Sequence, residues 1–202
     1  MKRDALRWLV APAVAWLALG SAMSGPILAQ GRPQIQNYNA PGNLESKFDL
    51  GCIELKDASP NYNPVDLDKA IKACLTGNKF DEAARLAGLA GVYGRYDTLR
   101  VADPTAHQAV IVARMEIIGE LPESDSAKFT AAINSILGDP QKLSSYCQDI
   151  RKIGPPSYLP RYMIQHGMNA FLAPGGDGLV KNFDSSAAWT SAMTTYLHCT
   201  TQ

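Results

Sequence analysis

The sequence predicts an all-α protein: a single compact, orthogonally packed helical domain of six or seven helices, held by two disulfides. Three observations predict this class. Apolar residues recur at helical spacing through most of the chain after residue 60. Helix-start signals, such as Asn63-Pro64 and Asp103-Pro104, precede several of these stretches. The chain also has four cysteines, an even number, which favours disulfides in an exported protein.

The first 29 residues have the layout of a secretory signal peptide. A basic start is followed by an uncharged run from Trp8 to Ala29, with small residues before two candidate cleavage sites. Cleavage after Ala22 or Ala29 fits, and we prefer Ala29. The alternative is an uncleaved anchor, because the run is close to the length that a bilayer requires. No lipobox cysteine follows. We therefore expect a periplasmic or secreted protein without an integral membrane span once the signal is removed.

Residues 30–48 contain many Gln, Asn, Gly and Pro residues and few apolar ones, so we expect a flexible arm before a helical domain at 49–202. The whole chain has 19 basic and 19 acidic side chains. This balance gives no global field that would attract nucleic acid or an anionic membrane.

The four cysteines lie far apart in the sequence, without CxxC spacing, which argues against a zinc site or a thioredoxin-type redox pair. Three pairings can be drawn, and we favour the sequential one. It joins Cys52 to Cys74 and Cys147 to Cys199.

Helical periodicity marks a series of stretches along the domain. They are NPVDLDKAIKACLT, FDEAARLAGLAGVY, PTAHQAVIVARMEIIG, ESDSAKFTAAINSIL, PQKLSSYCQDIRKI, SYLPRYMIQHGMNAFLA and SSAAWTSAMTTYLHC. The segment at 107–118 is apolar on nearly every side, so we expect it to be the central buried helix, although its Val-Ile-Val run also suits a strand.

The stretch NKFDEAARLAGLA resembles one hairpin of a tetratricopeptide repeat, over residues 66–94. No second unit follows at the 34-residue period, so a repeat array is not expected. Gly88 and Gly91 destabilise a helix by about 1 kcal/mol each relative to Ala. We expect them to allow the close approach of a neighbouring helix.

The segment YGRYDTLRVADPTAHQA, at 93–109, concentrates polar and aromatic side chains. A catalytic reading gives His107 proton transfer, with Asp97 or Asp103 to orient it. A structural reading makes Asp103 a helix cap, with Asp97 in the turn after the previous helix. We favour the structural reading and assign no catalytic residue.

A second segment, KIGPPSYLPRYM at 152–163, is either a rigid, half-exposed binding surface or a buried corner of the chain, and both readings stay open. We expect binding contacts from the 93–107 turn, from this segment or from the Gly-rich loop at 174–178. The candidate binding residues are Tyr93, Arg95, Tyr96, Arg100, Tyr158, Arg161 and Tyr162.

Motifs for other chemistry are missing from the sequence. The three histidines lie in separate segments, and no metal-binding, nucleotide-binding or GxSxG motif is present. We therefore expect no metal and no cofactor.

In architecture the chain resembles the small periplasmic helical proteins that neutralise secreted cell-envelope toxins, such as amidase immunity proteins. This resemblance implies a non-enzymatic binding or inhibitor protein with a protein partner. Two alternatives are a cell-envelope hydrolase using His107 with Asp97 or Asp103, and a non-catalytic envelope structural protein that attaches through residues 30–48.

Overall fold

The computed structural model describes residues 40–172 and 175–200, and this part of the chain is all-α as predicted. Its α-helices are α1 (Pro64–Thr76), α2 (Phe80–Arg100), α3 (Ala109–Ile118), α4 (Glu123–Leu137), α5 (Pro140–Ile153), α6 (Arg161–Ile164), α7 (Asn169–Leu172) and α8 (Ser185–Tyr196). Two 3-10 helices, η1 (Leu55–Asp57) and η2 (Pro104–Gln108), accompany them. The predicted signal peptide, 1–29, and residues 30–39 of the predicted arm lie outside the described residues.

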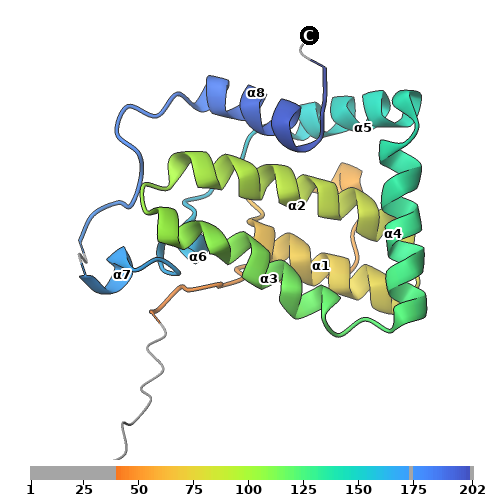
Figure 1. Cartoon of the computed structure of the whole chain (residues 1–202), viewed down its shortest axis with the longest axis horizontal. Coiled ribbons are helices and arrows are strands. Elements are labelled where there is room, and N and C mark those ends of the chain that lie inside the picture. The colour runs from red at the N-terminus through yellow and green to blue at the C-terminus, as the bar shows by residue number, and fades with distance from the viewer. Residues whose placement is uncertain (1–39, 173–174, 201–202) are drawn as a thin grey trace, which may run out of the picture. The chain divides into compact units, whose positions relative to one another are not determined.

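The central helix is α2, which contacts α1, α4 and α8 (Figure 1). Most of its side chains are buried, and it extends through Tyr93 and Asp97 to Arg100. The turn expected at Asp97 is therefore wrong, because the helix continues to Arg100. The prediction that 107–118 is the central buried helix is wrong too. The α3 helix packs mainly on α1 and leaves one apolar face in solvent.

Side-chain caps explain where several helices begin. At α1, Asn63 accepts hydrogen bonds from the backbone N–H groups of Val65 and Asp66, and the Asp66 carboxylate accepts one from the N–H of Asn63. This reciprocal capping box satisfies backbone donors that the first turn leaves free. At α5 and α8 the cap is one-directional: Asp139 and Asp184 accept hydrogen bonds from backbone N–H groups of the first turn.

Both predicted disulfides are confirmed. Cys52 pairs with Cys74 and Cys147 pairs with Cys199, closing loops of 22 and 52 residues. In the chain-entropy model these loops stabilise the fold by about 3 and about 4 kcal/mol. The first joins the segment before η1 to α1, and the second joins the segment after α8 to α5.

Residues 40–48 are bound to the helices, although they were expected to belong to a flexible arm. The N–H of Leu44 donates to the carbonyl of Tyr162 over 3.1 Å. The N–H groups of Lys47 and Phe48 donate to Asp66 over 2.5 and 3.0 Å. These bonds join this segment to α1 and α6, so residues 40–48 are part of the folded domain.

The helical stretch expected over 157–173 is broken, within its described residues, into α6 and α7. At the break, the N–H of Asn169 donates to the Asp103 carboxylate over 2.8 Å, and the N–H of Met168 donates to the Thr105 hydroxyl over 2.8 Å. A Cβ atom on Gly167 would overlap Asp103 and Ala106, so this approach requires glycine. Contacts with η2 therefore replace the helical continuation that the periodicity predicted.

Candidate functional site

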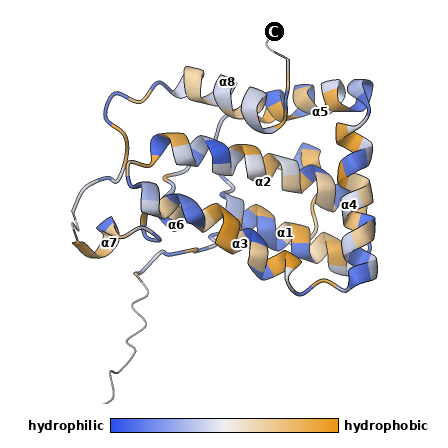
Figure 2. Ribbon diagram, in the orientation of Figure 1, coloured by the Kyte–Doolittle hydropathy of each residue, from blue (hydrophilic) through white to orange (hydrophobic). Residues whose placement is uncertain are grey.

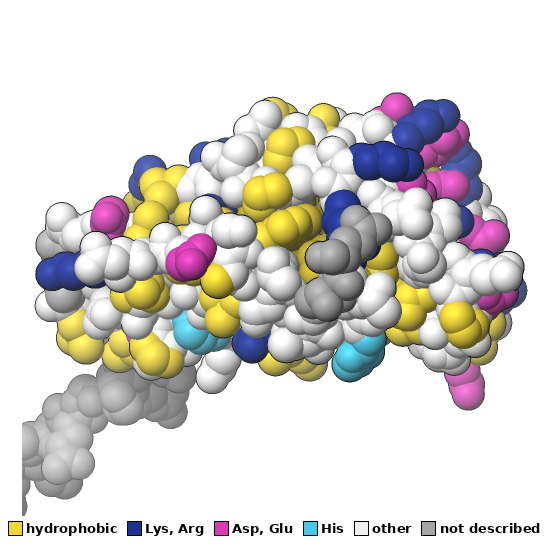
Figure 3. All heavy atoms as spheres, turned by 90° about the horizontal axis from the view of Figure 1, so that it is seen from above, with side chains coloured by type: hydrophobic (Ala, Val, Ile, Leu, Met, Phe, Trp, Pro, Cys, Tyr) yellow, Lys and Arg dark blue, Asp and Glu magenta, His cyan; other side chains and the backbone are white. Residues whose placement is uncertain are grey.

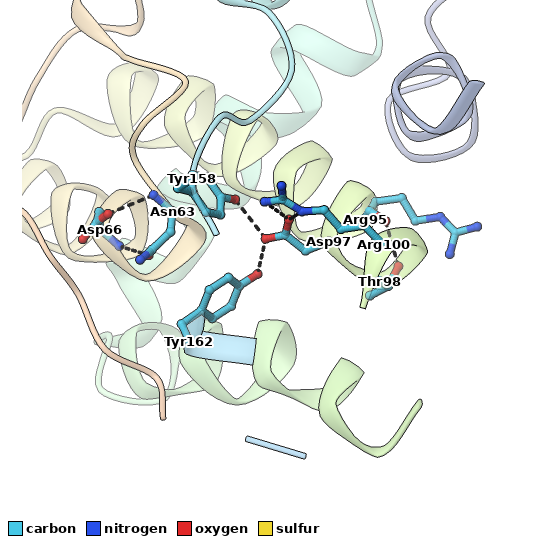
Figure 4. A network of polar contacts seen from close by, with 8 residues as sticks. All are labelled: Asn63, Asp66, Arg95, Asp97, Thr98, Arg100, Tyr158 and Tyr162. Atoms are coloured by element: carbon cyan, nitrogen blue, oxygen red, sulfur yellow. Dashed lines mark hydrogen bonds and ion pairs between the residues drawn. The ribbon is translucent and has the colours of Figure 1, made fainter. Parts of the chain in front are cut away.

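The cluster with the most polar chemistry centres on Asp97, which lies on α2 and is fully buried. Its Oδ1 accepts a hydrogen bond from Arg100 Nε over 2.8 Å, and Arg100 Nη2 lies 2.8 Å from the same oxygen without hydrogen-bond geometry. Its Oδ2 accepts the hydroxyls of Tyr158 and Tyr162 over 2.9 and 2.8 Å (Figure 4). We call these four residues the Asp97 network.

The network joins segments that are far apart in the sequence. Asp97 and Arg100 lie on α2, Tyr158 lies in the loop after α5, and Tyr162 lies on α6. Gly154, with a φ of 88°, lets the chain turn at the end of α5, and its carbonyl accepts the Tyr93 hydroxyl over 3.0 Å. The loop that carries the two phenols is thereby fixed at both of its ends.

Burial is the main influence on the charge state of the carboxylate. Burial raises the pKa of Asp97 to about 6, although the charge of Arg100 and the hydrogen bonds from the Tyr162 and Tyr158 hydroxyls act to lower this pKa. The carboxylate is therefore mostly ionised at pH 7, which matches the donors that surround it. Burial also raises the pKa of both phenols well above the usual value, so they remain donors.

Arg100 is enclosed by aromatic rings. Its guanidinium carbon lies 5.1 Å from the centre of the Tyr96 ring and 5.0 Å from that of Tyr158, within cation–π range. The backbone carbonyl of Arg100 accepts the N–H of Val180, in the loop before α8, over 2.8 Å. The buried charge is thus paired, stacked and covered, which is the arrangement of a structural ion pair.

The seven candidate binding residues do not form one exposed surface. Tyr93, Tyr96 and the three network members Arg100, Tyr158 and Tyr162 are buried. Of the two alternatives for the 152–163 segment, the buried corner therefore describes both of its tyrosines, Tyr158 and Tyr162. The two exposed members, Arg95 and Arg161, lie on different elements.

Neither of these two arginines belongs to the network. The Arg95 side chain points away from Asp97 (Figure 4). Arg161 packs over Gly42 and reaches the carbonyl of Pro41 over 3.5 Å. Both guanidinium groups are thus separate surface charges.

The three residues of the catalytic alternative are engaged separately. His107 Nε2 lies 3.0 Å from the carbonyl oxygen of Val101. Asp103 Oδ1 accepts the N–H and hydroxyl of Thr105 over 2.9 and 2.6 Å, and its other oxygen accepts Asn169. These hydrogen bonds, more than any charge, lower the pKa of Asp103 against its burial. No hydrogen bond joins His107 to Asp97 or Asp103 among the described residues.

A second ion pair, which the sequence did not predict, joins buried Asp68 on α1 to half-buried Arg114 on α3. Arg114 Nε donates to Asp68 Oδ1 over 2.7 Å, and Arg114 Nη2 reaches the carbonyl of Ala87 over 3.4 Å. Burial raises the pKa of Asp68, against the lowering by Arg114, and its Oδ2 has no hydrogen-bond partner among the described residues. This pair fixes the position of Arg114 on α3.

An apolar face of α3 is exposed, which the sequence did not predict. Figure 2 shows the hydrophobic residues along this helix. Ile111, Met115 and Ile118 are 62%, 66% and 39% exposed, and their spacing places them along one side of the helix. Arg114 lies three residues after Ile111 and four before Ile118, so it borders this face. The sequence does indicate this face, because the 107–118 segment is apolar on nearly every side. That pattern led us to expect complete burial.

A groove of about 200 Å³ adjoins this face at Arg114. Its floor is the small-residue side of α2, and its walls come from α4, α5 and α8. The lining residues are Ala84, Ala87, Gly88, Arg114, Ile133, Ile136, Leu137, Tyr146, Tyr196 and Leu197.

The glycines on α2 admit two tyrosine hydroxyls. A Cβ atom on Gly88 would overlap the hydroxyl of Tyr146, and one on Gly91 would overlap that of Tyr196. The close approach that we expected from a neighbouring helix is therefore made by two side chains, Tyr146 of α5 and Tyr196 of α8. Tyr146 is buried and donates to the carbonyl of Arg85, whereas Tyr196 is half exposed.

Two further features concern metals and membranes. Within residues 40–172 and 175–200, no three His, Cys, Asp or Glu side chains gather in a way that could hold a metal ion. No helix in the same ranges combines the length and apolar character needed to cross a bilayer. The two disulfides fit a protein of an oxidising compartment.

No protein-family model matches the chain, and no curated protein or solved structure matches it either.

Proposed function

We propose that the chain is an exported, non-catalytic binding protein of the inhibitor or immunity type, which recognises a partner protein through the outer face of α3 and the groove beside it. The signal-like sequence at residues 1–29 and the two disulfides support the export. The surface of α3 supports the binding role.

The observation that carries this proposal is the exposure of Ile111, Met115 and Ile118 on one side of α3. Adjacent apolar side chains in water mark interaction sites, because covering them releases ordered water. The adjoining groove, of about 200 Å³, is smaller than the roughly 300–1,000 Å³ of pockets for drug-sized ligands. It suits one apolar side chain that projects from a protein partner, as in a binding hot spot.

The polar clusters support a non-catalytic role. Asp97, Asp103 and His107 each have their own structural partners, and a reacting group needs a free position toward a substrate. The Asp97 network lies in the core and holds the 154–162 segment against α2.

Affinity capture from the producing cells tests the proposal. The mature, oxidised wild type is compared with Ile111→Asp/Met115→Asp, and with Leu172→Asp as a matched control at another exposed apolar position, on α7. We expect the wild type and the control to retain a stoichiometric partner protein and the α3 variant to lose it. Retention of that partner by a folded α3 variant would contradict the proposed face.

A further inference from the structure

A cleft of about 660 Å³ lies on a different part of the surface from the α3 face, between η1, α2 and the end of α5. Its volume is within the range of ligand pockets. Rigid elements build it, since the Cys52–Cys74 disulfide holds η1 and the Asp97 network holds the segment after α5. The lining residues are Glu54, Leu55, Lys56, Ala58, Pro60, Glu82, Arg85, Asp149, Lys152 and Ile153.

The cleft is strongly charged but electrically balanced. Three of its lining side chains are acidic and three are basic, and they surround the apolar residues Leu55 and Ile153. Figure 3 shows that charged side chains of both signs gather mostly at one end of the face that it presents. A balanced cleft does not favour a polyanion or a polycation, whereas it does favour a ligand that carries both signs.

Two ion pairs stand on opposite walls of the cleft. Lys56 lies 2.7 Å from Glu54 on the η1 wall, and Lys152 lies 2.9 Å from Asp149 on the α5 wall. All four side chains are substantially exposed, and such surface pairs contribute little to stability. They can therefore exchange partners with a ligand at small cost.

Between these walls, α2 presents one acid and one base without such partners. Glu82 and Arg85 are one turn apart, and neither side chain forms an ion pair within the described part of the chain. The Arg85 guanidinium lies 6.0 Å from the centre of the Tyr146 ring, and Tyr146 also donates to the Arg85 carbonyl. Tyr146 thus holds both the backbone and the guanidinium of Arg85, and the guanidinium N–H groups donate no hydrogen bond within the described residues.

We propose that this cleft binds a small zwitterionic ligand, an amino acid or a short peptide, with Arg85 on its carboxylate and Glu82 on its ammonium group. The planar guanidinium matches a carboxylate through two parallel hydrogen bonds, and a carboxylate accepts hydrogen bonds from an ammonium group. Leu55 and Ile153 would contact the apolar part of the ligand. This site is independent of the proposed α3 face.

The test is an NMR titration of the uniformly ¹⁵N-labelled, oxidised protein with trialanine at pH 7. Trialanine with an acetylated amine, with an amidated carboxyl and with both ends blocked serves as the comparison. We expect the free peptide to shift the amide signals of the cleft residues, and each blocked end to weaken binding roughly tenfold, as for the loss of one charge-assisted hydrogen bond.

Variants assign the two roles. Arg85→Gln should weaken binding of free trialanine roughly tenfold and should not change binding of the amidated peptide, which lacks the carboxylate. Glu82→Gln should also weaken binding of free trialanine roughly tenfold and should not change binding of the acetylated peptide, which lacks the ammonium group. Arg95→Gln and Asp81→Asn, at exposed positions of α2 outside the cleft, are the matched controls. Near-UV circular dichroism confirms that each variant is folded. The proposal is overturned if millimolar trialanine leaves the cleft signals unchanged, or if the doubly blocked peptide binds as well as the free one.

Discussion

Replacing Asp97 by Asn tests whether the Asp97 network stabilises the fold. In the wild type, Arg100, Tyr158 and Tyr162 all donate hydrogen bonds to the Asp97 carboxylate. The Asn amide keeps one acceptor oxygen, but its NH₂ group is itself a donor and must face either the guanidinium or the two hydroxyls. Arg100 is also left buried without a counter-charge. Removing one partner of a buried pair costs about 3–5 kcal/mol, so we expect a Tm lower by roughly 10 °C for a domain of this size.

The decisive comparison is a double-mutant cycle with Arg100→Met, measured by urea unfolding of the oxidised proteins with far-UV circular dichroism. When both charges are removed, no unpaired charge stays buried, so the free energy lost by the double variant should be about 1–3 kcal/mol smaller than the sum of the single losses. Additive losses, or an Asp97→Asn variant as stable as the wild type, would refute the interpretation of the network as a coupled ion pair.

Three further predictions concern Asp97, the glycines of α2 and the second disulfide. The pKa of Asp97, about 6, is above its unfolded value near 3.8, so the folded state binds this proton more tightly. The unfolding free energy of wild type relative to Asp97→Asn should therefore increase by about 2 kcal/mol as the pH falls from 7 to 4, as urea titrations at each pH would measure. Gly88→Ala should cost about 1–3 kcal/mol in thermal unfolding, because the Tyr146 hydroxyl is buried, whereas Gly91→Ala should be nearly neutral, because exposed Tyr196 can move away. Cys147→Ser/Cys199→Ser should lower stability by about 4 kcal/mol and increase hydrogen exchange at the end of α8, and unchanged exchange there would contradict this.

Local signals in the sequence were sufficient for the fold class and for several helix starts, whereas the disulfide pairing was a choice among three that the structure confirms. Asn63 with Pro64, and Asp139 with Pro140, determine helix starts through hydrogen bonds to the next few residues. Such bonds depend on adjacent residues only, so the pattern of residue types is enough to predict them.

Long-range contacts account for what the sequence did not predict. The break between α6 and α7 depends on Asp103, which is distant in the sequence from Asn169. The burial of Tyr158 depends on its pairing with Asp97 across 61 positions. The α3 helix looked like a core element because periodicity cannot distinguish an apolar face that packs in the core from one that stays in solvent.

Site-specific photocrosslinking in the producing cells tests the central claim, partner binding through α3, most directly. A photoreactive amino acid at position 115 of α3 is compared with the same residue at position 172 of α7, since Met115 and Leu172 are similarly exposed. We predict one discrete crosslinked protein from position 115 and none from position 172. Crosslinks from position 172 alone, or no crosslink at position 115 while the protein still co-purifies with a partner, would contradict α3 as the binding face.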